Sequence, residues 1–95
     1  MSSVLDRFKV GGKVVVITGG AGFLGSQYAE ALESAGALPV IWDKELKGTR
    51  HRGFSVDVTK PENLRLVAKQ TVADFGKIDV LINNAGKNPA VGSEE

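Results

Sequence analysis

VVVITGGAGFLG, residues 14–25, is the stretch of sequence that decides the fold. It opens with a continuous β-branched run, which is typical of a strand buried on both faces of a parallel sheet. Residues 20–25 then form a literal G-x-G-x-x-G between this strand and a helix. Glycines let a backbone approach phosphates closely, and the first turn of a helix offers unpaired N–H groups and a partial positive charge. The stretch therefore predicts a diphosphate site, with a tight turn that binds nothing as the alternative.

Strands and helices alternate along the rest of the chain. The residue patterns predict a helix over 24–35 that ends at Gly36, a strand over 38–42, a polar loop over 44–53, a strand over 54–58, a helix over 61–75 that ends at Gly76, and a strand over 78–82. Thr59 and Glu62 match a capping box at the start of the second helix. This order of elements predicts an α/β domain with a parallel sheet.

Apolar residues recur at helical spacing in both predicted helices, which indicates the face that each turns to the sheet. The residues that share this face are Leu24, Tyr28, Ala31, Leu32 and Ala35 in the first helix, and Leu64, Val67, Ala68, Thr71, Val72 and Phe75 in the second. Tyr28 is expected to be a core or half-buried residue. Trp42, at a strand end, is expected to pack in the interior rather than to stack on a ligand. His51 falls in the basic loop, where we expect a solvated side chain.

The handedness of the connections converts this order of elements into a sheet. Crossovers between parallel strands are right-handed in nearly all proteins, so the first three strands step in one direction. If the fourth strand pairs with the free side of the first, the sheet is doubly wound, with strand order 3-2-1-4 and one helix on each face. Open α/β sheets bind ligands where the direction reverses, which is here between strands one and four. The loops over 18–25 and 83–86 flank that crevice.

An acidic residue at the end of the second strand points to the kind of nucleotide. In dinucleotide-binding folds, an acid about 20 residues after the glycine loop binds the adenine-ribose hydroxyls. Asp43 lies at close to this distance from Gly25, the last glycine of the loop. A carboxylate there repels a 2′-phosphate, so NAD is favoured over NADP, although the adjacent Lys44 softens this preference. The alternative for Asp43 is an ordinary solvated acid at a strand end.

The composition excludes other classes of function. The 95 residues are 42% hydrophobic and 24% charged with a net charge of +1, which fits one globular domain and indicates no nucleic-acid or membrane partner. Cysteine is absent, and a single histidine without cysteine leads us to expect no metal site. No signal peptide or membrane-spanning run is recognisable, so we expect a cytoplasmic protein.

Three motifs together resemble the short-chain dehydrogenase/reductase family, in that family's order and spacing: residues 18–25, Asp57-Val58-Thr59, and Asn83-Asn84-Ala85-Gly86. The resemblance implies a Rossmann-like fold and an NAD-dependent oxidoreductase that transfers hydride between NAD and an alcohol/carbonyl pair. With Asp43, the cofactor-binding residues we predict are Gly19, Gly22, Phe23, Leu24, Gly25, Asp43, Asp57, Val58, Asn84, Ala85 and Gly86.

The resemblance also implies a role for each of these residues. The glycines form the turn, and the N–H groups of Phe23 and Leu24 hold the diphosphate. Asp57 accepts from the adenine amino group, and Val58 packs on the adenine face. Residues 84–86 pass beside the adenine ribose and the start of the nicotinamide half, whereas Asn83 ties the fourth strand to its neighbours.

One motif departs from the family's common single-domain branch. Position 23 is Phe and glycine falls at 22, which is similar to the extended, epimerase-like branch, whereas the two later motifs favour the single-domain oxidoreductases. Two alternatives therefore stay open. One is a fragment of an extended-branch sugar-nucleotide epimerase or dehydratase, and the other is a nucleotide-binding module without catalysis.

The chemistry of the family requires residues that this chain does not contain. The resemblance implies a Tyr-x-x-x-Lys pair and a serine, but the single tyrosine, Tyr28, is followed four residues later by Leu32. We therefore expect a truncated, inactive N-terminal portion: a partial dinucleotide-binding domain over 1–95, with a flexible tail over 87–95. An alcohol or carbonyl substrate would bind only in a full-length context. The apolar edge of the fourth strand would favour self-association.

Overall fold

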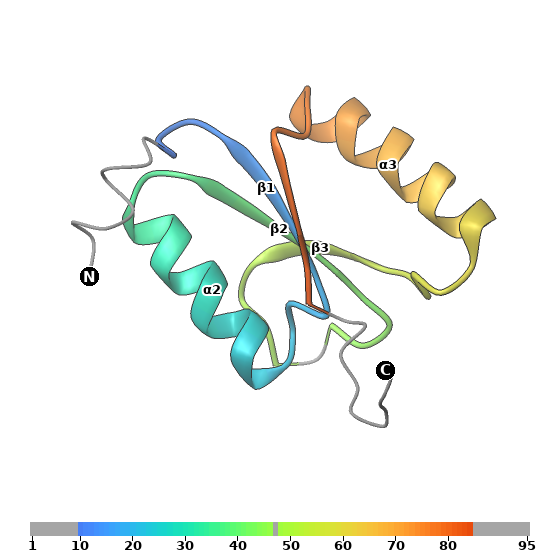
Figure 1. Ribbon diagram of the computed structural model, residues 1–95, viewed down its shortest axis with the longest axis horizontal. Helices are drawn as coiled ribbons and strands as arrows, with labels where there is room; N and C mark the ends of the chain where they lie inside the picture. The colour runs from blue at the N-terminus through green and yellow to red at the C-terminus, as the bar shows by residue number, and fades with distance from the viewer. Residues whose placement is uncertain (1–9, 47, 85–95) are drawn as a thin grey trace.

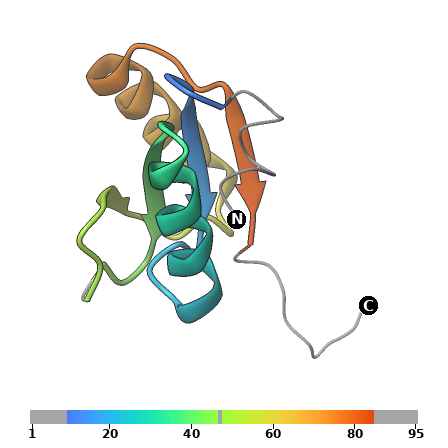
Figure 2. The same ribbon diagram turned by 90° about the vertical axis from the view of Figure 1, so that its left-hand side faces the viewer.

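The computed structural model describes residues 10–46 and 48–84 of the chain. Its elements are β1 (Val14–Thr18), α2 (Phe23–Ser34), β2 (Leu38–Asp43), β3 (Arg52–Ser55), α3 (Pro61–Phe75) and β4 (Val80–Asn83). The strands form one parallel sheet in the order β3-β2-β1-β4, with α2 and α3 on opposite faces (Figures 1 and 2). The predicted strand order is therefore confirmed. The tail predicted over 87–95 lies outside the described residues.

The side chains of β1 divide the interior into two apolar layers. Val15 and Ile17 pack with Ala29 and Leu32 of α2, whereas the alternate β1 residues pack with β2 and with Val67 of α3. All five β1 residues are buried. A strand buried on both faces explains why its sequence is a continuous β-branched run rather than an alternating pattern.

The buried face of α2 differs from the predicted one. Gly25, Ala29 and Leu32 are buried, whereas Leu24 and Tyr28 are 47% and 39% exposed. A Cβ added at Gly25 would lie 2.5 Å from the Cα of Gly20, so the helix approaches the glycine loop too closely for a side chain. Leu32 lies on the predicted face, but the small residues Gly25 and Ala29 make the closest approach to the sheet and the glycine loop, so the face is turned away from Leu24.

The second helix also buries less than its pattern predicts. Val67 and Thr71 are buried, but Leu64 and Val72 remain 37% and 45% exposed. The predicted capping box is wrong. Lys60 is the N-cap of α3 and no side chain caps the helix, because the Thr59 hydroxyl donates to Asp57 instead.

The ends of the elements follow backbone constraints. Gly36 and Gly76 both have a φ of 91°, the left-handed conformation predicted after each helix. The third strand covers Arg52–Ser55 rather than 54–58, because β2 ends at Asp43, opposite Ser55, and offers no partner further on. The fourth strand begins at Val80, opposite Val15 of β1. Within residues 10–46 and 48–84, no helix has the length and apolarity needed to cross a membrane.

Candidate functional site

A glycine loop joins the carboxyl end of β1 to α2. Gly19 has a φ of 69°, and its N–H donates to the Trp42 carbonyl of β2 at 2.8 Å, while Gly22 N–H donates back to Gly19 O at 3.2 Å. Within the described residues, no side chain caps α2 and no acid lies in its first turn. The free N–H groups and the positive end of the helix dipole are therefore available to an anion.

Two glycines of this loop are constrained in different ways. Gly25 has no room for a side chain, since an added Cβ would also lie 2.6 Å from Gly19 O. Gly22 has an ordinary φ of −77°, and a Cβ there would come no closer than 3.6 Å to Gly19 O. The fold itself therefore requires glycine at 25 but leaves an open surface at 22.

Asp43 lies at the carboxyl end of β2, directly beside the glycine loop. Its Oδ2 accepts from Ala21 N–H at 3.1 Å, and its Oδ1 accepts from Glu45 N–H at 3.3 Å. These bonds join the end of β2 to the loop after β1, so the structure brings together the two features that the sequence predicted at one place.

Asp57 follows β3 and holds an ionised carboxylate in a fixed orientation. Its Oδ1 accepts from the Thr59 hydroxyl at 2.6 Å and from Thr59 N–H at 3.0 Å. The hydrogen bond from the Thr59 hydroxyl, followed by the one from the backbone, lowers the pKa of Asp57. Its other oxygen, Oδ2, has no hydrogen bond to the described residues and remains free to accept one.

Asn84 connects the end of β4 to the same loop. Its Nδ2 donates to Gly19 O at 3.2 Å, and its backbone N–H donates to the Thr18 hydroxyl at 2.9 Å. That hydroxyl in turn contacts Asn83 Oδ1 at 3.1 Å, which confirms that Asn83 ties β4 to β1. Ala85 and Gly86, which complete the predicted motif, lie outside the described residues.

These residues surround one pocket of about 470 Å³ at the carboxyl ends of the strands. Its lining consists of Gly19, Trp42, Asp43, Lys44, Val56, Asp57, Val58, Thr59 and Asn84. The side chains of Phe23 and Leu24 do not line it and are 81% and 47% exposed, although their backbone begins α2 beside it. The pocket combines the carboxylates of Asp43 and Asp57 with the apolar side chains of Trp42, Val56 and Val58.

The model of the short chain dehydrogenase family matches residues 13–95. The chain belongs to this family. It is 42% identical over 86 residues to the L-fucose dehydrogenase of Oryctolagus cuniculus, with 82% of this chain and 30% of that protein covered. It is 35% identical over 97 residues to a sorbose reductase of Candida albicans, with 90% and 34% covered.

A solved structure of an NAD⁺-bound xylitol dehydrogenase is similar to this chain. The TM-score is 0.73 and the sequence identity 34%, with 83% of this chain and 35% of the other covered. The chain therefore spans about a third of the length of the proteins it matches.

The structure decides the environment of two aromatic side chains, Trp42 and His51. Trp42 is 4% exposed and donates from Nε1 to the Thr71 hydroxyl at 3.0 Å, so the packing role predicted for it is confirmed. The expectation of a solvated His51 is wrong. Its side chain is 4% exposed, with Nε2 3.2 Å from Glu30 Oε2. The two residues are 21 positions apart, and no periodic pattern in the sequence indicates this contact.

Proposed function

We propose that this chain is the NAD-binding part of an oxidoreductase that transfers hydride between NAD and an alcohol/carbonyl pair. The observation that carries the proposal is the single pocket lined by Gly19, Asp43, Asp57, Val58 and Asn84 at the carboxyl ends of the strands. Such a pocket, at the point where the strand order reverses, is where doubly wound sheets bind dinucleotides.

The described residues suit the adenosine and diphosphate parts of a dinucleotide. The uncapped start of α2 and the open surface at Gly22 suit the diphosphate. Asp43 suits the adenine-ribose hydroxyls, and the free Oδ2 of Asp57 suits the adenine amino group, with Val58 against the ring. Residues 84–86 would pass beside the adenine ribose and the start of the nicotinamide half. The bound cofactor would supply the hydride acceptor, and the chain's own residues would hold and orient it.

We propose NAD rather than NADP as the cofactor. Asp43 stands beside the glycine loop with its carboxylate held by two backbone N–H groups, so its charge cannot easily turn away from a 2′-phosphate. Like charges brought together in this way cost several kcal/mol. Lys44 also lines the pocket and would offset part of that repulsion.

For the whole protein we propose a sugar or polyol as the substrate. The L-fucose dehydrogenase, the sorbose reductase and the xylitol dehydrogenase are all named for polyhydroxylated substrates. The residues that would select among them are not in this chain, and neither is a Tyr-x-x-x-Lys pair. We therefore expect residues 1–95 to bind NAD without turning over. The glycine at 22 still supports the extended-branch alternative, but the names of these relatives favour hydride transfer.

The free edge of β4 supports our proposal that the chain associates with itself. Val80 and Leu81 are 39% and 54% exposed, and no charged side chain lies within the strand. The opposite edge strand begins with Arg52, and charge on an edge discourages pairing. Sedimentation velocity should show dimers or larger species, and a monomer at high concentration would contradict the proposal.

Calorimetry on the 95-residue chain tests the cofactor proposal directly. NAD and AMP should both bind, and NADP should bind at least tenfold more weakly, a difference of about 1.4 kcal/mol. When xylitol or L-fucose is added with NAD, the absorbance of reduced nicotinamide should not rise, because the chain should not catalyse hydride transfer. Failure of both NAD and AMP to bind would remove the dinucleotide site, whereas equal binding of NAD and NADP would remove only the role of Asp43 in selecting between them.

A further inference from the structure

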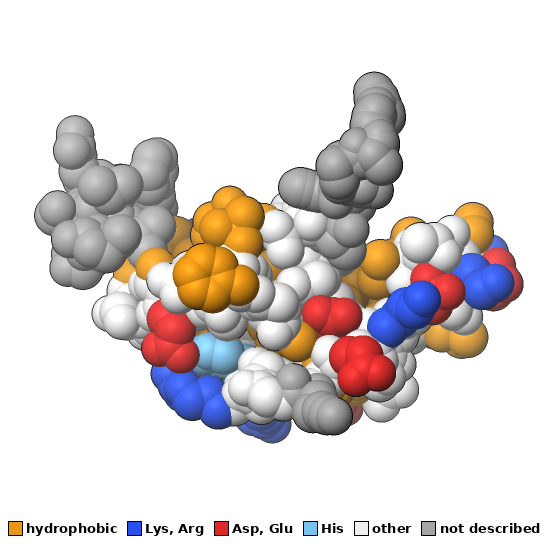
Figure 3. Space-filling model, turned by 90° about the horizontal axis from the view of Figure 1, so that it is seen from below, with side chains coloured by type: hydrophobic (Ala, Val, Ile, Leu, Met, Phe, Trp, Pro, Cys, Tyr) orange, Lys and Arg blue, Asp and Glu red, His pale blue; other side chains and the backbone are white. Residues whose placement is uncertain are grey.

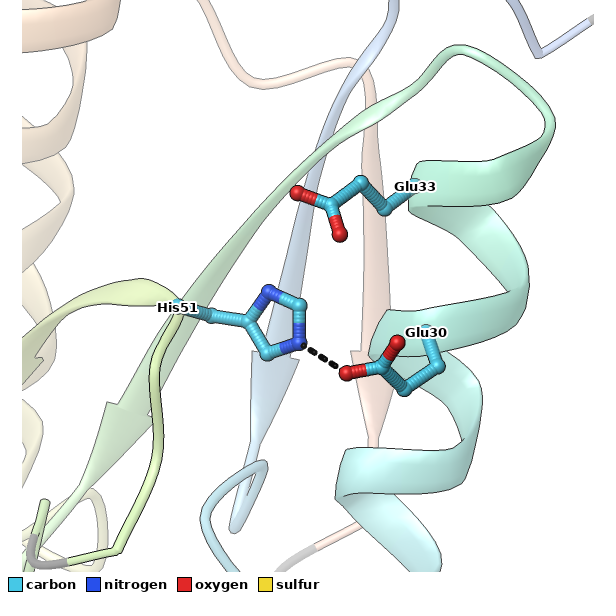
Figure 4. Close-up of side chains that lie close together, drawn as sticks. All are labelled: Glu30, Glu33 and His51. Carbon is cyan, nitrogen blue, oxygen red and sulfur yellow. Dashed lines mark hydrogen bonds and ion pairs between the residues drawn. The ribbon is translucent and has the colours of Figure 1, made fainter.

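Glu30, Glu33 and His51 form a polar cluster separate from the nucleotide pocket (Figure 4). The two glutamates lie one turn apart on α2, and His51 belongs to the connection between β2 and β3. Their nitrogen and carboxylate oxygens all lie within 4.8 Å of one another, and none of the three residues lines the nucleotide pocket. Acidic and basic side chains gather around the histidine on the surface in Figure 3.

The histidine is the unusual member of this cluster. Its side chain is 4% exposed, and its ring points between the two carboxylates (Figure 4). Among the described residues, Glu30 is the side chain that lies within hydrogen-bond distance of the ring, with Nε2 3.2 Å from Glu30 Oε2. An imidazole nitrogen without its proton could serve here as a metal ligand beside the two carboxylates.

Arg50 supplies the positive charge that now balances the glutamates. Its guanidinium bonds to Glu30 at 2.9 Å and to Glu33 at 2.5 Å, but the three side chains are 61%, 53% and 45% exposed. Ion pairs between side chains this exposed contribute little to stability. Arg50 can therefore move into solvent at little cost. Even with Arg50 in place, the two carboxylates outnumber the single guanidinium that bonds to them.

We propose that Glu30, Glu33 and His51 form a site for a divalent transition metal such as Zn²⁺, in competition with the Arg50 guanidinium. Imidazole nitrogen and carboxylate oxygen are ordinary zinc ligands, and three of them leave a fourth position for water. The ligands come from α2 and from the segment that follows Asp43, so the metal ties that segment to the helix. The sequence alone did not indicate this site, because Glu30 and His51 are 21 residues apart.

Zinc titration by calorimetry, on chain produced without a histidine tag, tests the proposal. His51 is the only histidine and cysteine is absent, so Zn²⁺ has no other nitrogen or sulfur side-chain ligand. Wild type should bind one Zn²⁺, and His51→Gln should weaken binding at least tenfold. Arg50→Gln should strengthen it several-fold, because the competing cation is removed. Co²⁺ should give the absorption bands of a nitrogen- and oxygen-ligated ion in wild type but not in His51→Gln.

Two further measurements keep the proposal falsifiable. Far-ultraviolet circular dichroism tests whether each variant is folded. If His51→Gln does not fold, Glu33→Gln takes its place as the variant that removes a ligand. Zn²⁺ should raise the melting temperature of wild type and leave that of the variant unchanged. If wild type and Arg50→Gln bind Zn²⁺ no more tightly than the ligand variant, the cluster is an ion-pair network and the proposal is wrong. NAD binding is read separately, so neither result depends on the other.

Discussion

The two ends of the parallel sheet are built from the same strands but use their polar groups differently. At the amino end, Val14 N–H donates to Asp79 Oδ2 at 2.8 Å and Asp79 N–H donates back to Val14 O at 2.9 Å. Leu38 N–H likewise donates to Lys13 O at 2.8 Å. The groups at this end are consumed by bonds within the protein.

The carboxyl end keeps part of its bonding capacity free. The first-turn N–H groups of α2 have no side-chain cap in the described chain, and Asp57 uses one carboxylate oxygen while the other stays free. An end that leaves donors and acceptors unused is suited to binding, and an end that consumes them is suited to stability. Substitutions at the two ends should therefore separate nucleotide affinity from the free energy of unfolding.

Gly25→Ala should have the largest effect because it damages both properties. The added Cβ would lie 2.5 Å and 2.6 Å from backbone atoms of Gly20 and Gly19, which cannot yield as a flexible side chain can. Overpacking typically costs 1–3 kcal/mol, more than the roughly 1 kcal/mol that alanine ordinarily contributes over glycine in a helix. We expect urea unfolding to show a net loss of up to about 2 kcal/mol, and calorimetry to show no NAD binding. Wild-type stability would show that the close approach is not required.

Gly22→Val, in the same loop, should lower NAD affinity while leaving the free energy of unfolding nearly unchanged. Gly22 has an ordinary φ of −77° and room for a Cβ, so the unfolding free energy should change by about 1 kcal/mol or less. A β-branched side chain would, however, block the approach of phosphate to the backbone. NAD affinity should fall roughly 100-fold, about 2.7 kcal/mol. Retained affinity would place the diphosphate elsewhere.

Much of this contrast could be predicted from the sequence. The strand order followed from the handedness of crossovers, and the site followed because the carboxyl ends of β1, β2 and β4 must meet at one edge of the sheet. The buried face of α2 could not be predicted in this way. Gly25 and Ala29 are buried there, and a search for large apolar residues passes over them. The burial of His51 could not be predicted either. Its partner Glu30 is distant in the chain, and the sequence of the loop that carries His51 has no periodic apolar pattern.

Asp43→Ala should have an intermediate effect confined to binding. The loss of one charged hydrogen-bond acceptor should weaken NAD about tenfold, or about 1.4 kcal/mol, and should narrow the difference between NAD and NADP. Asp74→Ala, which removes an exposed acid from α3, is the matched control for the change in net charge. Calorimetry with both nucleotides measures each variant. An Asp43→Ala chain that binds NAD as tightly as the control would remove Asp43 from the site.

Asp79→Asn should have the smallest effect, and only on stability, because Asp79 belongs to the amino end. The hydrogen bond from Val14 N–H, followed by the one from Lys77, lowers the pKa of Asp79 below its ordinary value of 3.8. A carboxyl whose pKa is lower in the folded state stabilises the fold above its unfolded pKa, and this contribution disappears as the pH falls through the folded value. Urea unfolding should therefore show a small loss for the variant at neutral pH that vanishes in acid. NAD affinity should not change; if it did, the two ends of the sheet would be coupled, and the separation of binding from stability would fail.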